Sequence, residues 1–168
     1  RTSINGLDVI AGVFEAQEFS IPATEDTYIY GTNTGTTYGT ENELIVKGTS
    51  KSSFELWFGS DSTHRRTFIK FDISQLVDEK ITAGAAYLTL QCTDVENNEL
   101  STPLEIKTTS ASWSESNATY KNLKTASATK IATVTVAGKG IVSVDITDYI
   151  NECIQKGTKT LNLVIDGT

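Results

Sequence analysis

Short segments with a strand-like pattern recur along the whole chain, and this recurrence constrains the fold more than any other feature. In the run Thr67–Ile73, the apolar residues Ile69, Phe71 and Ile73 take every second position. Phe68, Lys70 and Asp72 lie between them, on the other face. A period of two predicts a strand with one buried face and one face in water. Loops rich in Gly, Ser, Thr and Asn separate this run from others like it. Many short strands joined by polar turns predict an all-β fold, a jelly-roll-like antiparallel β-sandwich.

One short helix is predicted near the C-terminus, over Asp148–Gln155, with Thr147 or Asp148 as its N-cap and Gly157 at its end. No internal repeat or linker is visible, so residues 18–168 are predicted to form one sandwich domain, preceded by a strand-bearing extension, residues 1–17. The predicted strands are Leu7–Phe14, Glu18–Ala23, Thr27–Tyr30, Glu43–Val46, Phe54–Phe58, Thr67–Ile73, Ala85–Cys92, Leu104–Lys107, Thr133–Val136, Val142–Ile146 and Thr160–Ile165.

Charge and cysteine content narrow the class of protein. The net charge is −7, which argues against nucleic acid as a partner because phosphate binding needs a basic surface. No apolar run is long enough to cross a membrane, and we expect an exported protein that acts outside the cell or at its surface. The two cysteines, Cys92 and Cys153, are then expected to form a disulfide; the alternative is two unrelated buried thiols.

Several motifs follow one another in order along residues 20–165. They are Ala23–Tyr30, Asn33 with Tyr38-Gly39, Glu43–Gly48, the pair Arg65-Arg66 before F-I-K-F-D-I-S, Trp113-Ser114-Glu115 with Thr119-Tyr120 and Asn122, and Val144-Asp145-Ile146-Thr147-Asp148. Together these motifs resemble the DNRLRE family of secreted β-sandwich modules. The resemblance implies a non-catalytic protein, and several members of that family bind polysaccharide.

The chain departs from the family pattern at both ends. Members usually close with a further strand after the point at which this chain stops, and here an added strand, Leu7–Phe14, stands at the other end. A sandwich without its last strand has an open edge, which another strand can fill. The set Leu7, Val9, Ala11 and Val13 shares one face and suits such a groove. The strand is either donated to a neighbouring subunit, which builds a filament, or folded back within its own chain.

Catalysis is not expected. The sole histidine, His64, is interpreted as a solvated loop residue without an orienting partner, and the carboxylates follow no catalytic spacing. No cofactor is predicted; the loop that holds Asp94, Glu96, Asn97 and Glu99 supplies oxygen ligands that suit calcium, against a solvated acidic turn as the alternative. Asn117 begins a glycosylation sequon whose use depends on the host.

Two non-catalytic functions remain open. The one we favour on the sequence is a structural subunit that forms a homopolymer by donor-strand complementation. The alternative is a module that binds an anionic polysaccharide such as alginate, as the resemblance implies. In that case the candidate contacts are Trp57 and Tyr38 for ring stacking, and Arg65 and Arg66 for sugar carboxylates. Trp113 is instead expected to be a core or rim residue.

Overall fold

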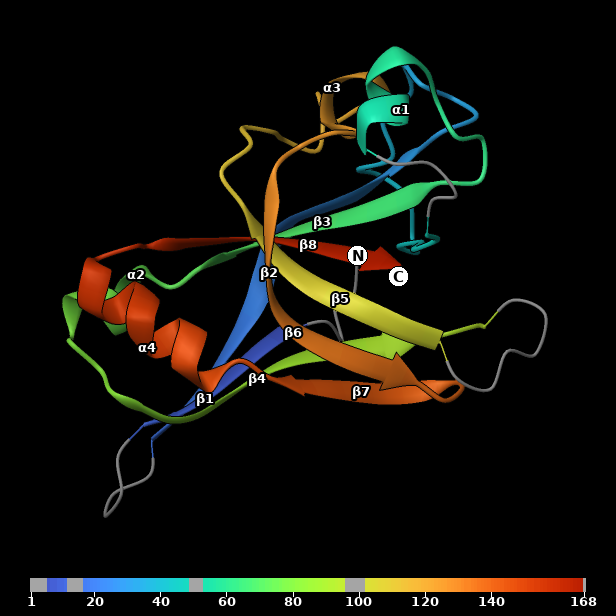
Figure 1. The fold of residues 1–168 in the computed structure, drawn as a ribbon. Helices are drawn as coiled ribbons and strands as arrows, with labels where there is room; N and C mark the ends of the chain where they lie inside the picture. The colour runs from blue at the N-terminus through green and yellow to red at the C-terminus, as the bar shows by residue number, and fades with distance from the viewer. Residues whose placement is uncertain (1–5, 12–16, 49–52, 96–101, 168) are drawn as a thin grey trace.

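The sandwich is built from eight antiparallel strands in the part of the chain that a computed structural model describes, residues 6–11, 17–48, 53–95 and 102–167 (Figure 1). The strands follow the order β6-β5-β8-β3-β2-β1-β4-β7. Their bounds are β1 Gly6–Ala11, β2 Gln17–Tyr30, β3 Arg65–Asp72, β4 Ala83–Cys92, β5 Thr102–Thr109, β6 Ala128–Val136, β7 Gly140–Asp145 and β8 Thr160–Gly167. The helices are α1 Ser53–Phe58, α2 Ser74–Asp78, α3 Tyr120–Leu123 and α4 Thr147–Lys156.

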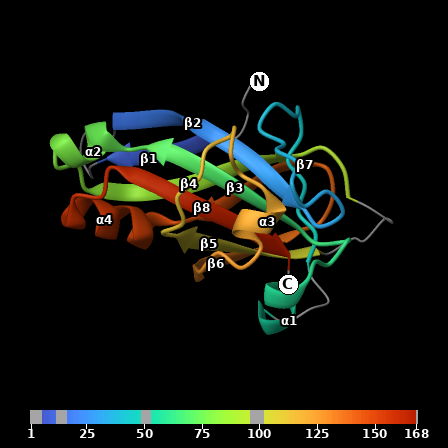
Figure 2. The same cartoon turned by 90° about the horizontal axis from the view of Figure 1, so that it is seen from above.

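The long strand β2 joins the two layers. Its first half pairs with β1 from Gln17 to Pro22, and its second half pairs with β3 from Ala23 to Tyr30, with a register shift between Ala23 and Glu25. One layer is therefore β2-β1-β4-β7 and the other is β2-β3-β8-β5-β6 (Figure 2). The outermost strands, β6 and β7, are consecutive and contact each other, so the sheet nearly closes on itself. The predicted all-β, jelly-roll-like sandwich is confirmed.

The main core fills the space between the two layers. Alternate residues of the strands point into it, because successive side chains in a strand face opposite sides. Helix α4 packs over one end and adds Ile150 and Cys153. The fully buried members include Leu7, Val9, Ile69, Phe71, Ala86, Leu88, Ile106, Leu161 and Leu163.

Strand β1 is an internal strand of this sandwich. It pairs antiparallel with β2 on one side and β4 on the other, and Leu7, Val9 and Ala11 are buried in the core, as their shared face predicted. Val13 lies outside the described residues. Both partners belong to the same chain, so the fold-back alternative describes the structure. Strand donation, which we favoured on the sequence, gains no support from it.

The outer face of β3 is covered over most of its length, which corrects the prediction of a wet face. Arg66 and Phe68 are buried and Lys70 is half-buried, whereas Asp72 is exposed. Phe68 is fully buried in a second cluster on the outside of β3 and β8, where it contacts Trp113 edge to face. Trp113 is a core residue, as expected, and its indole N–H donates to Asn162. Helices α1 and α3 and the segment between β5 and α3 cover this side of the sheet. The other members of this second cluster are Ile29, Leu56, Ala118, Tyr120, Leu123 and Val164.

Two predicted strands are wrong. Phe54, Leu56 and Phe58 alternate as in a strand, but Ser53–Phe58 forms α1, in which Phe54 and Phe58 lie one turn apart and contact each other, with ring centroids 5.1 Å apart. The segment Glu43–Val46 belongs to none of the strands in the described residues. The next residue, Lys47, forms an isolated β-bridge to Arg65. The predicted strands Glu18–Ala23 and Thr27–Tyr30 are one strand, β2.

The helix predicted near the C-terminus is confirmed as α4. Gly157 ends it with φ 73°, a left-handed conformation that glycine adopts without strain. Its N-cap position is Ile146 rather than Thr147 or Asp148. Asp145 holds the turn instead, because its carboxylate accepts a hydrogen bond from the Thr147 amide at 2.9 Å.

The predicted disulfide is wrong, since Cys92 and Cys153 are both free thiols. Helix α4 is attached to the beginning of β4, where Asn151 exchanges two hydrogen bonds with the backbone of Ala83. Cys92 is at the other end of that ten-residue strand, roughly 30 Å away. Bridged cysteines have Cα atoms within about 7 Å of each other.

A buried ion pair connects the outer layer to the sheet. The Arg66 guanidinium makes two hydrogen bonds to Asp166 of β8, at 2.8 and 3.1 Å, and donates further to the carbonyls of Leu123, Lys124 and Ala126. Burial alone would raise the pKa of Asp166, but the hydrogen bonds and charges of Arg66 and of Lys107 hold it below its ordinary value. Arg66 therefore holds the chain beyond α3 against β3 and β8.

We expect Arg66→Ala to lower the free energy of unfolding by about 3–5 kcal/mol, because it leaves Asp166 buried with Lys107 as its remaining cation. Urea denaturation at neutral pH measures the change. The neighbouring substitution Arg65→Ala is the control, and it should cost less than about 1 kcal/mol because Arg65 is partly exposed. Equal losses in the two variants would contradict the structural role of Arg66.

Candidate functional site

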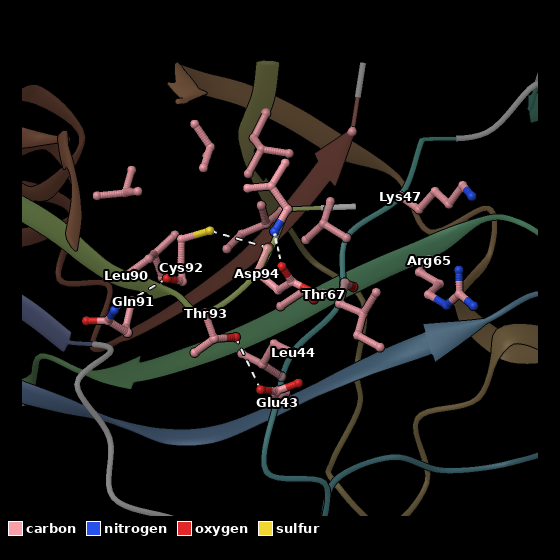
Figure 3. Close-up of a pocket in the computed structure, with 18 of the residues that line it drawn as sticks. Glu43, Leu44, Lys47, Arg65, Thr67, Leu90, Gln91, Cys92, Thr93 and Asp94 are labelled. Atoms are coloured by element: carbon pink, nitrogen blue, oxygen red, sulfur yellow. Dashed lines mark hydrogen bonds between the residues drawn. The ribbon is translucent and has the colours of Figure 1, made fainter. Parts of the chain in front are cut away.

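A pocket of about 720 Å³ lies at one open end of the sandwich. The end of β4, the beginning of β5 and the end of β8 meet there, and the segment 43–48 lies across them (Figure 3). Apolar side chains line its inner part, and polar and charged ones line its edge. The apolar lining includes Leu44, Leu90, Leu104, Val136, Val142 and Ile165.

The segment 43–48 lies against both β3 and β8. The Thr67 hydroxyl of β3 donates to the carbonyl of Ile45 at 2.9 Å. The backbone of Gly167, at the end of β8, passes so close to Gly48 that a Cβ on Gly167 would lie 2.5 Å from the Gly48 nitrogen. Glycine at 167 is therefore needed for the segment to close this side of the pocket.

Two cations stand directly opposite each other at the pocket's edge. Lys47 and Arg65 exchange both backbone N–H···O bonds, each 3.0 Å long. Residues paired in this way have neighbouring side chains, and like charges at such positions repel each other. The Arg65 guanidinium lies 3.8 Å from the centroid of the Tyr30 ring and donates to the Thr63 carbonyl. Figure 3 shows both cationic side chains on one side of the pocket.

The opposite edge is acidic and polar. Thr93 donates a hydrogen bond to the Glu43 carboxylate at 3.2 Å, and the Cys92 thiol donates to the Asp94 carbonyl at 3.5 Å (Figure 3). Asp94 is thus the one calcium candidate that the structure describes; Glu96, Asn97 and Glu99 lie outside the described residues. Within the described ranges, no three His, Cys, Asp or Glu side chains gather as metal ligands would.

A second feature of the surface is an exposed aromatic cluster on α1. Phe54, Trp57 and Phe58 have exposed fractions of 73%, 70% and 75%. Leu56, on the opposite side of the same helix, is buried in the second cluster. The spacing i, i+3 and i+4 brings the three rings together on one side of the helix. We call Phe54, Trp57 and Phe58 the α1 aromatic cluster.

The four predicted glycan contacts divide evenly between surface and interior. Trp57 and Arg65 lie at the surface. Tyr38 is buried, where it stacks on Tyr28 with ring centroids 4.4 Å apart and accepts a hydrogen bond from Asn33. Arg66 is buried in its ion pair with Asp166, so it does not reach the surface as a glycan contact would.

Sequence reasoning missed Lys47 and two of the aromatic residues. Phe54 and Phe58 are separated by one helical turn, and this spacing, which also fits the alternation of a strand, is the signal that points to α1. Lys47 gains its place only through the bridge to Arg65, which no local pattern marks.

His64 is not solvated, contrary to prediction. It is buried against Tyr120, with its Nδ1 2.8 Å from the phenol oxygen. Burial lowers the pKa of His64 to about 4, because the charged imidazolium is disfavoured away from water. His64 is neutral at neutral pH and packs as part of the outer layer.

A sandwich that carries an end pocket, a cation pair and an exposed aromatic cluster is the architecture of a ligand-binding module. The family model of carbohydrate-binding module family 96 (CBM96) matches residues 17–168, and the chain belongs to that family. This agrees with the polysaccharide-binding members of the family that the sequence resembles, although the match does not itself carry the DNRLRE name. A search of curated protein sequences gave no match to this chain. In the described residues, none of the helices could span a bilayer.

Stability should fall as the pH drops from 6.5 to 4, because the unfolded chain binds a proton at His64 in this window while the folded protein does not. The expected loss is on the order of 2–3 kcal/mol. The pKa of Asp166 is held below its ordinary value in the folded protein, so this carboxylate adds to the loss of stability only towards the acidic end of the range. Urea denaturation at several pH values, with His64→Gln as the control, measures it. The variant should lose the slope between pH 6.5 and 4, and an unchanged slope would contradict the assignment.

Proposed function

We propose that the chain is an extracellular, non-catalytic module that binds an anionic polysaccharide of the alginate type. The observation that carries the proposal is the Lys47–Arg65 pair, two cations held directly opposite each other at the edge of the pocket. Family membership supports carbohydrate as the class of ligand. The positive charge of the Lys47–Arg65 edge supports an acidic sugar within that class.

The cation pair is suited to a uronic-acid carboxylate. The Arg65 guanidinium can make two parallel hydrogen bonds to one carboxylate, and Lys47 adds a point charge beside it. Contact with the Tyr30 ring limits the movement of Arg65, so less conformational entropy is lost when the sugar binds.

The protein's overall charge makes the binding local. At −7, the chain repels a polyanion at long range, and only the few side chains in direct contact attract it. Binding should therefore depend strongly on Lys47 and Arg65. Salt should weaken binding, since exposed charge pairs are screened.

We expect Arg65→Ala to lower the affinity for alginate about tenfold or more, as hydrogen bonds to charged groups contribute about 1.5–3 kcal/mol. Lys47→Ala should give a smaller loss, and Arg65→Lys should recover only part of the affinity because it cannot bind a carboxylate through two parallel bonds. Isothermal titration calorimetry against alginate, pectin and a neutral glucan measures these effects.

The control for this series is Lys159→Ala. Lys159 pairs with Asp78 beside α2, away from the pocket, so its loss should leave the affinity unchanged. If the intact protein shows no binding to any acidic polysaccharide, or if Lys159→Ala weakens binding as much as Arg65→Ala, the proposed site is wrong.

A further inference from the structure

We propose that the α1 aromatic cluster is a second contact surface for the polysaccharide, on which the C–H faces of pyranose rings stack. This inference rests on the proposed function and extends it from one bound sugar to a polymer that crosses two neighbouring surfaces. The Lys47–Arg65 pair holds an acidic group, and Phe54, Trp57 and Phe58 hold rings farther along the same polysaccharide chain.

The first argument is exposure. Single apolar side chains on a protein surface are ordinary, but three aromatic side chains that are each at least 70% exposed on one six-residue helix form a cluster. The other exposed large hydrophobic residues in the described ranges, such as Ile141 and Tyr87 in the opposite layer, are scattered. An exposed cluster of this kind marks a contact surface.

The second argument is that the cluster is fixed in position. Leu56 anchors α1 in the second cluster, and the Gly59 amide closes the helix on the Leu56 carbonyl. The Lys124 ammonium, just after α3, donates to the Gly59 carbonyl. Aromatic side chains have few rotatable bonds, so a helix held in this way presents its rings at a low entropic cost of binding.

The third argument is continuity with the cation pair. Helix α1 lies in the excursion of the chain that leaves the sheet after Lys47 and returns at Arg65, and the backbone bridge between these residues closes the loop. In Figure 1, α1 stands above the end of β3 at which the excursion returns. One loop of the chain therefore carries both contact surfaces, with the cation pair at its base and the aromatic rings on the helix within it.

The chemistry of α1 favours sugar over the other ligands of exposed apolar helices. An interfacial membrane helix carries Lys or Arg on its polar face, whereas α1 has none and includes Glu55. Aromatic rings suit a flat ligand that has one apolar face and a polar rim, as a pyranose has.

The test compares the intact protein with the double variant Trp57→Ala/Phe58→Ala. Alginate polymer and alginate disaccharide are titrated by calorimetry at low and moderate salt. The polymer affinity of the variant should fall at least tenfold, while its disaccharide affinity and the salt dependence of binding should stay within twofold, because stacking adds contact area without charge. Ile141→Ala, which removes an exposed apolar side chain from β7, is the matched control and should leave polymer binding unchanged.

Tryptophan fluorescence gives a second readout, since Trp113 is buried and Trp57 is the exposed one of the two tryptophans. Polymer should protect Trp57 from acrylamide quenching, and Trp57→Phe should remove this signal while keeping a stacking ring. The aromatic surface would be wrong if the double variant bound the polymer with an affinity within twofold of that of the intact protein, and if the polymer did not protect Trp57. That result would not contradict the role of the cation pair.

The failure of the proposed function would look different. The intact protein would then bind a neutral glucan but no acidic polymer. If this glucan protected Trp57 and bound the double variant more weakly, the proposal of an anionic ligand would be wrong and the aromatic surface would be supported. A self-association of the intact protein that the double variant abolishes, without any effect on polysaccharide, would assign the cluster to a protein interface and overturn this inference.

Discussion

The burial of β3 on both faces is the constraint on which the rest of the structure depends. Ile69 and Phe71 fill the space between the two layers, and Phe68 points to the other side, where it would otherwise face water. A covering layer is therefore required, and Trp113, Tyr120 and the helices α1 and α3 provide it. The same layer carries the exposed rings of α1, so the packing of the sheet's outer face determines where part of the candidate site lies.

The two consecutive arginines at the start of β3 show how the alternation of a strand separates structure from recognition. Arg65 shares the inner face with Thr67 and reaches the pocket at the open end of the sandwich. Arg66 points to the outer face, where its guanidinium donates hydrogen bonds to Asp166 and to three backbone carbonyls. The sequence presents the two as equivalent candidates, because nothing in it marks which face is covered. Only the second cluster makes Arg66 a structural residue.

Much of the fold could be predicted from the sequence, because most strands carry a period of two over several residues. The helices were harder. The turns Asp72-Ile73-Ser74 and Asp145-Ile146-Thr147 are alike: in each, the aspartate accepts the amide two residues later at 2.9 Å, and a helix follows. Only the second was predicted, since α4 shows amphipathic spacing over ten residues and α2 has five. A match between the two tripeptides was the signal that could have found α2.

The candidate site could be predicted only in part, because its charge arrangement arises from pairing across the fold. Lys47 and Arg65 are distant in sequence, and the segment 43–48 that carries Lys47 lies against β3 through Thr67 and against β8 at Gly167. At physiological salt the Debye length is about 8 Å, so a ligand at this edge is influenced mainly by the nearest charges and little by the distant ones that sum to −7. An acidic protein can therefore hold an acidic polymer where two cations are forced together and aromatic rings add uncharged contact beside them.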